Sequence, residues 1–357
     1  MTNKNLTHKE KKISLVKKIK HKIFFLFRLN NHPVIKVYNG FGNHEKFIVL
    51  GHVLKLSPMP RKTYRHNWVT NLFSILRLFM VVPFSSAKVS MEWRGITCHT
   101  KTEKDGFFRF EIFQSGAPVE GWQSVTVKLE EDKYQMRDIH GCGQIYIPFP
   151  SQLAFISDID DTFLVSHSSR LRRRLYVLFT KNAHTRKPFE GVVNHYQLLA
   201  CSGQVGSNTN PFFYVSGSEW NLYDFIVEFS LANKLPKGVF LLSQMKKIKE
   251  FWKSGQNNLS TKFMRIVRIV EAYPHLQFIL LGDDSQQDPF IYSSIVSHFP
   301  QKIIAVYIRR IDKSNNEKVQ LALEEIEKNG VSCCYFKHSA EAVIHSKKIG
   351  LISSDLA

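Results

Sequence analysis

Residues 153–162 read Leu153-Ala154-Phe155-Ile156-Ser157-Asp158-Ile159-Asp160-Asp161-Thr162, an apolar run that ends in three closely spaced carboxylates. The apolar run predicts a buried parallel strand, and open α/β sheets bind their ligands where such strands end. Like charges this close need a cation or a shared proton to coexist. The stretch therefore favours a metal-dependent phosphoryl site. An acidic turn that caps a helix is the alternative, because Asp and Thr are ordinary N-cap residues.

A second acidic cluster follows a second apolar run. Residues 278–281 lead into Gly282-Asp283-Asp284-Ser285-Gln286-Gln287-Asp288. Magnesium prefers hard oxygen ligands and typically takes one or two protein carboxylates, a requirement that Asp158, Asp283 and Asp288 fit. Gly282 would let the backbone come close to the metal shell, and a plain turn glycine is the alternative. Two such strand ends can meet around one cation.

A hydroxyl-bearing segment and a lysine lie between the two acidic clusters. Residues 211–215 predict a strand that ends in Ser216-Gly217-Ser218, where a hydroxyl and an amide are placed to hold a phosphate oxygen. Ser216 is alternatively the N-cap of a helix predicted from Trp220 to Phe229. Lys262 opens a helix-like stretch just before the second acidic strand and could neutralise a phosphoryl group as a point charge.

Taken in order, these elements resemble the haloacid dehalogenase superfamily of phosphotransferases. From about residue 155 to residue 352 the chain is similar, within that superfamily, to the phosphatidate phosphatase catalytic domain named for the actin patch protein. Five stretches carry the resemblance: Ser157–Thr162, Asn182–Val192, Phe213–Ser216, Trp220–Tyr223 and Gly282–Pro289.

The resemblance implies a magnesium-dependent phosphatidate phosphatase that forms diacylglycerol and phosphate through an aspartyl-phosphate. Asp158 would be the nucleophile, and Asp160 would act first as general acid and then as general base. The residues implied to orient and neutralise the phosphoryl group are Thr162, Ser216, Gly217 and Lys262. The implied magnesium ligands are Asp158, Asp160, Asp283 and Asp288.

Three positions depart from the family pattern. The chain has Ser260-Thr261 where the family usually shows a histidine before the lysine, Glu219 where it shows a proline, and Asp284 where serine is more common. None of these changes removes a catalytic group. They bear on substrate preference more than on chemistry.

The sequence patterns divide the chain into three predicted parts. Residues 1–30 form a basic amphipathic segment that suits a membrane interface, or else a solvated basic tail. Residues 31–150 alternate apolar and polar side chains in short runs, which predicts a β-sandwich, with a helix at residues 71–80. Residues 151–357 alternate strands with helices, which predicts a parallel sheet covered on both faces, and the family resemblance implies that this sheet is haloacid-dehalogenase-like. An arginine-rich insert at 170–179 is either a short cap that meets lipid head groups or a solvated helix.

The charge and the cysteine content limit the classes of partner and ligand that the protein is expected to bind. The 357 residues carry 49 Lys and Arg against 30 Asp and Glu, a net charge of +19, which indicates an acidic partner. No nucleic-acid reader motif is visible, which leaves an anionic membrane as the indicated partner. That the substrate is the anionic phospholipid phosphatidate is what the family resemblance implies, and the basic, apolar-studded flanks agree with it. The five cysteines show no metal-binding or disulfide spacing.

The location and the competing functions follow from the same features. The apolar runs are too short for a signal peptide or a bilayer span, so we expect a cytoplasmic protein with peripheral contact at the inner membrane surface. A soluble phosphomonoesterase of the same superfamily is the first alternative, and a non-catalytic membrane-binding adaptor is the second. The oligomeric state stays open.

Overall fold

The computed structural model describes residues 29–30, 32–59, 77–113, 120–130, 138–149, 153–159, 189–203, 208–245, 258–285, 287–311 and 316–353. Residues 1–28 of the predicted basic segment 1–30, the arginine-rich insert 170–179 and the predicted site residues Asp160 and Thr162 lie outside these ranges, whereas Leu29 and Asn30 form a short strand. In the part of the chain that is described, no helix has the length and apolar character needed to cross a membrane.

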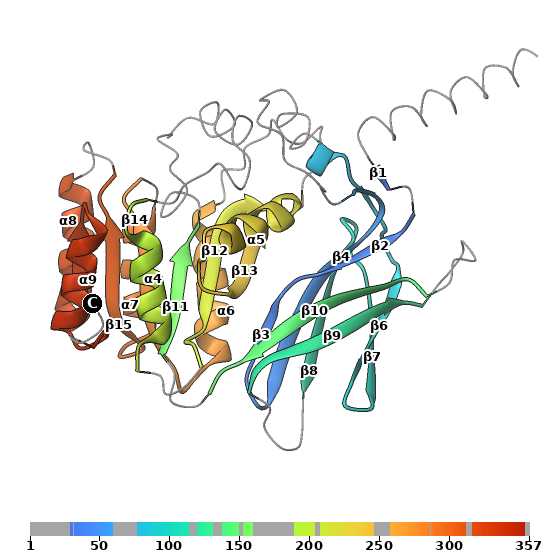
Figure 1. The fold of residues 1–357 in the computed structure, drawn as a ribbon, viewed down its shortest axis with the longest axis horizontal. Coiled ribbons are helices and arrows are strands. Elements are labelled where there is room, and N and C mark those ends of the chain that lie inside the picture. The colour runs from blue at the N-terminus through green and yellow to red at the C-terminus, as the bar shows by residue number, and fades with distance from the viewer. Residues whose placement is uncertain are drawn as a thin grey trace, which may run out of the picture.

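A six-stranded parallel sheet forms the C-terminal part of the molecule (Figure 1). Its strands in spatial order are β13 (Gly238–Ser243), β12 (Phe212–Glu219), β11 (Leu153–Asp158), β14 (Gln277–Asp283), β15 (Ile303–Arg309) and β16 (Ser332–Phe336). Every neighbouring pair is parallel. The chain builds outward from β11 to β13 and then returns to β14 on the other side of β11. The carboxyl ends of β11 and β14 are therefore the topological switch point, where open α/β sheets place their ligands.

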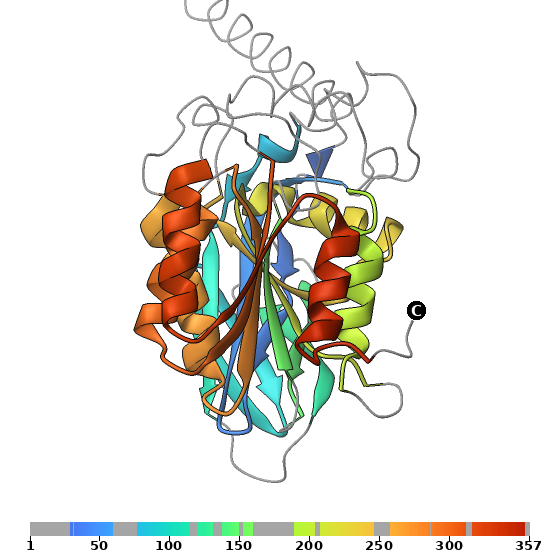
Figure 2. The ribbon, with the colours of Figure 1, turned by 90° about the vertical axis from the view of Figure 1, so that its left-hand side faces the viewer.

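Helices cover both faces of this sheet, as the alternation of elements predicts (Figure 2). On one face lie α4 (Val192–Cys201) and α9 (Ser339–Lys348), and on the other lie α6 (Asn258–Ala272), α7 (Asp288–His298) and α8 (Asn316–Lys328). The connection from β12 to β13 contains a short 3₁₀ helix, η2 (Trp220–Leu222), and then α5 (Tyr223–Ala232). The α/β class and the parallel sheet are confirmed.

The predicted helix boundaries need two corrections. Helix α6 begins at Asn258 rather than at Lys262. Its first residues include Ser260 and Thr261, which are weak helix formers and hid the start of the helix in the sequence. The helix predicted from Trp220 begins instead as η2 and becomes α-helical at Tyr223.

The N-terminal part, here called the β-rich part (residues 29–149), is one ten-stranded sheet. All its strand pairs are antiparallel except β3 with β10. The strands are β1 (Leu29–Asn30), β2 (Val34–Val37), β3 (Gly40–Gly42), β4 (Lys46–Pro58), β5 (Val82–Pro83), β6 (Lys88–Trp93), β7 (Ile96–Lys101), β8 (Phe107–Phe113), β9 (Gly121–Leu129) and β10 (His140–Ile147).

Alternate side chains of these strands are buried, as the period of a half-buried strand requires. Inward-facing residues of β2, β4, β6, β8, β9 and β10 form one apolar cluster. The sandwich arrangement stays a prediction. Of the predicted helix at 71–80 only the end is described, as the 3₁₀ helix η1 (Arg77–Phe79).

The two sheets share a buried core. The ten-stranded sheet ends at Ile147 and the six-stranded sheet begins at Leu153, on either side of the predicted boundary near residue 150. Tyr38, Phe41 and Tyr146 of the β-rich part nevertheless belong to the same buried apolar cluster as the strands of the parallel sheet. The β-rich part therefore lies directly against the parallel sheet, beside β12 and β13 (Figure 1).

Candidate active site

The two predicted acidic strand ends meet at the switch point. Asp158 is the last residue of β11 and Asp283 the last of β14, the strand that pairs with β11. Both side chains are withdrawn from solvent, with 1% and 0% of their surface exposed. Because parallel strands expose their carboxyl ends at one edge, the fold itself brings these two carboxylates to the same place.

Lys262 joins two of the predicted acids. Its Nζ donates to Oδ1 of Asp158 at 2.7 Å and also to Oδ1 of Asp288, the first residue of α7. All three side chains are buried. Helices α6 and α7 thus bring a lysine and a third carboxylate to the strand end that carries Asp158.

The charge of Lys262 is maintained by these neighbours. Burial alone lowers the pKa of its ammonium group, but the carboxylates of Asp158 and Asp288 outweigh burial and hold the pKa above its usual value. Lys262 therefore contributes one positive charge beside the three buried carboxylates of Asp158, Asp283 and Asp288.

Gly282 allows the close approach of Asp288. A Cβ at this position would come within 2.5 Å of Oδ2 of Asp288 and 2.9 Å of Cε2 of Tyr292. Only a residue without a side chain fits there without moving the carboxylate. The close-approach interpretation of this glycine therefore explains the structure better than a plain turn does.

Ser216 lies in an irregular end of β12. Its side chain is fully buried, and its Oγ accepts a hydrogen bond from the backbone N–H of Ser218 at 2.8 Å. The alternative that Ser216 caps a helix is wrong, because Glu219 precedes η2 and Leu222 precedes α5, neither with a side-chain cap. The hydroxyl instead holds the turn formed by residues 216–218.

Arg265 is a site residue that the sequence reasoning missed. It follows Lys262 by one helical turn on α6, and its guanidinium donates to the carbonyl oxygen of Ser216 at 2.9 Å and to Oγ of Ser243 at 3.2 Å. The i, i+3 spacing on one helix face was the available signal. Arg265 connects the helix that carries Lys262 to the strand end that carries Ser216.

Asp284 has a structural role beside the site. Its Oδ2 accepts from the hydroxyl of Tyr335 at 2.7 Å, and its Oδ1 accepts from the N–H of Ile311 at 2.6 Å. The departure from the family pattern at this position therefore ties the end of β14 to β16 and to the segment after β15.

Arg309 is a second buried cation near this edge that the sequence did not indicate. It is the register partner of Asp283, and its guanidinium lies 4.8 Å from the ring centroids of both Phe189 and Phe336. Nη2 donates to Oγ of Ser339 at 2.7 Å. Burial lowers the pKa of Arg309, while Tyr196 and Asp283 act in the opposite direction. Through its contact with the ring of Phe189, Arg309 holds the segment that leads into α4.

The donor chemistry of the site fits magnesium. Asp158, Asp283 and Asp288 offer hard carboxylate oxygens, and the glycine at 282 makes room for one of them. Among the described residues, however, no three His, Cys, Asp or Glu side chains are already arranged to hold an ion. In the described structure the ammonium of Lys262 lies between two of the carboxylates, and Asp160, a fourth predicted ligand, falls outside the described ranges.

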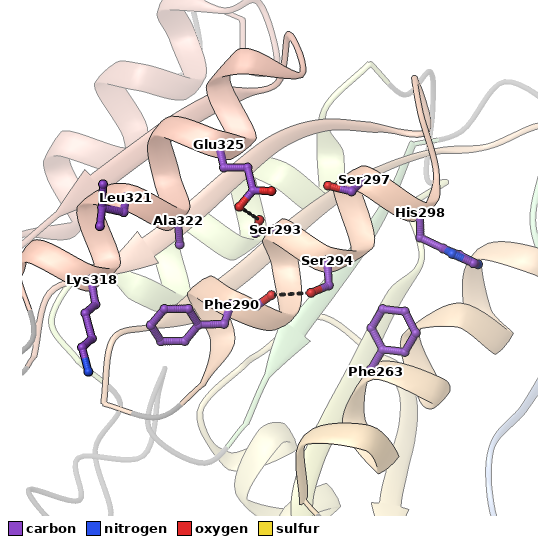
Figure 3. Close-up of a pocket in the computed structure, with 10 residues that line it drawn as sticks. All are labelled: Phe263, Phe290, Ser293, Ser294, Ser297, His298, Lys318, Leu321, Ala322 and Glu325. Carbon is purple, nitrogen blue, oxygen red and sulfur yellow. Dashed lines mark hydrogen bonds between the residues drawn. The ribbon is translucent and has the colours of Figure 1, made fainter.

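A shallow pocket of about 750 Å³ opens elsewhere, between α6, α7 and α8 (Figure 3). None of the predicted site residues lines it, and the hydroxyls of Ser293 and Ser294 are bonded to Glu325 and to the carbonyl of Phe290. Its lining residues are Phe263, Phe290, Ser293, Ser294, Ser297, His298, Lys318, Leu321, Ala322 and Glu325. The pocket is therefore separate from the acidic strand ends.

Comparison with known proteins agrees with the predicted family. Residues 153–310 match the family model described as the phosphatidate phosphatase APP1 catalytic domain. The chain is also 27% identical over 168 residues to phosphatidate phosphatase APP1 of Saccharomyces cerevisiae, a match that covers 47% of this chain and 27% of the relative. The resemblance is confirmed for this segment, and both matches support a phosphatase.

A solved structure gives a weaker likeness. The crystal structure of a carbohydrate acetylesterase from Xanthomonas citri aligns with 89% of this chain and 75% of its own, at 8% identity and a TM-score of 0.33. A similarity that low carries no argument about fold or function.

Proposed function

We propose that the protein is a magnesium-dependent phosphatidate phosphatase with a haloacid-dehalogenase-like fold, which forms diacylglycerol and phosphate at a membrane surface. The observation that carries the proposal is the buried pairing of Lys262 with Asp158 and Asp288 at the switch point of the sheet. The match of residues 153–310 to a phosphatase catalytic domain supports the same reaction.

Asp158 is the proposed nucleophile. One carboxylate oxygen forms a bond to phosphorus while the bond from phosphorus to the diacylglycerol oxygen breaks, which leaves an aspartyl-phosphate. Lys262 holds Oδ1 of Asp158 and so fixes the orientation of the carboxylate before the attack. Burial strengthens this control, because charges interact more strongly away from water.

Asp160 is the proposed proton carrier. As an acid it gives its proton to the leaving alkoxide, and as a carboxylate it then takes a proton from the water that attacks phosphorus. The second step breaks the bond to Asp158 and releases inorganic phosphate. The proton that Asp160 gives to the alkoxide is replaced by the one that it takes from water, so phosphatidate and water are the only reactants that the two displacements need.

The phosphoryl oxygens need positive charge and hydrogen-bond donors. Lys262, the hydroxyls of Ser216 and Thr162, and the backbone at Gly217 are the proposed phosphate-binding groups. Asp158, Asp160, Asp283 and Asp288 would hold Mg²⁺, which, when bound, supplies charge neutralisation to the phosphoryl group. Before substrate arrives, Lys262 compensates two of these carboxylates.

The lipid substrate is the most specific part of the proposal. The relative from Saccharomyces cerevisiae is named a phosphatidate phosphatase, and phosphatidate is an anionic phosphomonoester that suits a chain of net charge +19. Peripheral attachment through the basic residues 1–30 would bring the enzyme to the membrane, since anionic lipid attracts each Lys or Arg by about 1 kcal/mol.

Phosphate release in mixed micelles tests the function. With Mg²⁺, we expect release from phosphatidate to exceed release from soluble sugar and nucleotide monophosphates. A preference for the soluble compounds would overturn the lipid assignment in favour of a soluble phosphomonoesterase, and no release from any of them would favour an adaptor.

Two matched variants test the nucleophile. Asp158→Asn should abolish release. Asp284→Asn replaces a neighbouring buried acid that holds Tyr335, and it should keep most of the activity. Wild-type rates in Asp158→Asn would remove the nucleophile assignment.

A further inference from the structure

The proposed phosphate-binding segment is a bulge at the end of β12. Val215 pairs with Leu241, and the next pair is Glu219 with Ser243. The β12 residues between these pairs, Ser216 to Ser218, therefore outnumber the single β13 residue opposite them. A bulge turns side chains away from the regular ladder and is common next to active sites. The path of the backbone at Gly217 depends on what holds each end of the bulge.

The near end and the carbonyl of the bulge are held within the α/β part. Val215 belongs to the regular pairing of β12 with both neighbours, and Arg265 fixes the carbonyl oxygen of Ser216 at 2.9 Å. The far end is paired with β13 through Glu219 and Ser243, and it then leads directly into Trp220, the first residue of η2, whose side chain is only 6% exposed.

Trp220 packs against Tyr223 of α5, but the ring that stacks on it comes from the β-rich part. The ring of Tyr38 stacks on the ring of Trp220 with centroids 4.0 Å apart and planes inclined by 12°. Tyr38 belongs to the short connection from β2 to β3, and its side chain is fully buried. Stacked aromatic pairs of this kind contribute about 0.5–1.5 kcal/mol beyond the area that they bury.

Tyr38 is itself held on several sides. Its N–H donates to the carbonyl of Leu50 at 2.8 Å, and its hydroxyl lies 2.9 Å from Nδ1 of the buried His52. The next residue, Asn39, donates its side-chain amide to the carbonyl of Gly238 at 3.1 Å and its N–H to the hydroxyl of Tyr223 at 3.1 Å. Tyr38 is thus a rigid support against which η2 rests.

We infer that the stack of Tyr38 on Trp220 positions the bulge Ser216–Ser218, so that the β-rich part is required to shape the phosphate-binding site. This inference rests on the proposed function for the identity of the ligand. Tyr38 and Trp220 are positioning residues, because they act through the bulge and not on the substrate. A phosphatase whose catalytic groups all lie beyond residue 153 would then still need residues 29–149.

The test compares two equal substitutions at the same interface in the full chain. Tyr38→Leu removes the stacked ring, whereas Tyr146→Leu removes a buried ring that lies 5.1 Å from Trp122 and bonds the carbonyl of Thr209. Tyr38→Phe is the conservative variant, since it keeps the ring and loses only the bond to His52. Hydrogen exchange of the amides in residues 212–222 is measured for all three, together with kcat and KM.

For Tyr38→Leu we expect faster exchange at the bulge amides and a KM raised roughly ten- to a hundredfold, since small misplacements of binding groups are costly. Tyr38→Phe should restore both values to near wild type, and Tyr146→Leu should leave both unchanged at a comparable loss of melting temperature. Equal effects of the two leucine variants, or unchanged exchange in Tyr38→Leu, would overturn the inference.

Two readouts separate this inference from the proposed function. If the wild-type protein releases no phosphate from any substrate, the function fails, and the exchange comparison still decides the positioning claim. If Tyr38→Leu does not fold, Trp220→Phe replaces it, because a smaller ring reduces the same overlap from the other side. Unchanged exchange in Trp220→Phe would then overturn the inference.

Discussion

The ammonium group of Lys262 lies 2.7 Å from Oδ1 of Asp158, although 104 residues separate the two in the chain. This contact joins the first strand of the parallel sheet to a helix that the chain forms only after crossing β13. Both side chains are almost completely buried, so their charges depend on each other and on Asp288. The residues of the candidate site therefore also contribute to the free energy of folding.

Replacing Lys262 with methionine should destabilise the protein. The change removes the cation that contacts both buried carboxylates, and removing one partner of a buried ion pair typically costs about 3–5 kcal/mol. We expect the urea midpoint in EDTA to fall accordingly and Mg²⁺ to recover part of the loss, because a divalent ion would supply the missing charge. Lys237→Met is the control, since Lys237 is exposed and bonds only Gln144 and the face of Trp122 among the described residues. A midpoint unchanged in Lys262→Met would contradict the burial of the pair.

Gly282→Ala should weaken magnesium binding. The added Cβ would lie 2.5 Å from Oδ2 of Asp288, so that carboxylate has to move. We expect a lower melting temperature in EDTA, a smaller rise of that temperature on adding Mg²⁺, and a loss of activity of at least tenfold. If Mg²⁺ stabilises the variant as much as the wild type, Asp288 does not bind the ion.

The strands of the site could be predicted because buried parallel strands are continuous apolar runs. Residues 153–156 and 278–281 are such runs, and an aspartate follows each of them two residues later, which located both strand ends. The fold rule for open α/β sheets then predicts that Asp158 and Asp283 lie close together. Lys262 followed from its position ahead of the second acidic strand.

The supporting contacts could not be predicted in the same way. The stack of Tyr38 on Trp220 joins two sheets that are distant in sequence, and no local pattern encodes their packing. Arg265 reaches from a helix to a backbone carbonyl, and no local pattern in the sequence distinguishes it from Arg268 on the same helix. The bulge at residues 216–218 depends on the pairing of β12 with β13, which is known only once the strand order is known.

Arg265→Lys should raise KM with little effect on stability. Arg265 reaches the carbonyl of Ser216 with Nη1 and the hydroxyl of Ser243 with Nη2, whereas a lysine has one nitrogen on a differently shaped side chain and cannot reproduce the two bonds with this planar fork geometry. We expect KM to rise several-fold while the melting temperature changes little. Arg268→Lys serves as control, because Arg268 is exposed on the same helix. Identical kinetics in the two variants would exclude a role for Arg265 at the bulge.

Two buried histidines should make the protein sensitive to mild acid. Burial, helped by nearby positive charge, lowers the pKa of both His52 and His195 from 6.5 to about 3. Each is therefore neutral in the folded state.

The unfolded chain takes up protons at both positions near pH 6.5, so it binds more protons than the folded chain from there down to about pH 3. Stability is complete above pH 6.5 and falls as the pH decreases, by about 1.4 kcal/mol per pH unit for each histidine well below 6.5. Urea unfolding at pH 7, 6 and 5 measures this slope. His52→Gln cannot be protonated and should show about half of the histidine contribution, even though it loses the partner of the Tyr38 hydroxyl. A slope equal to that of the wild type would show that His52 is already charged in the folded protein.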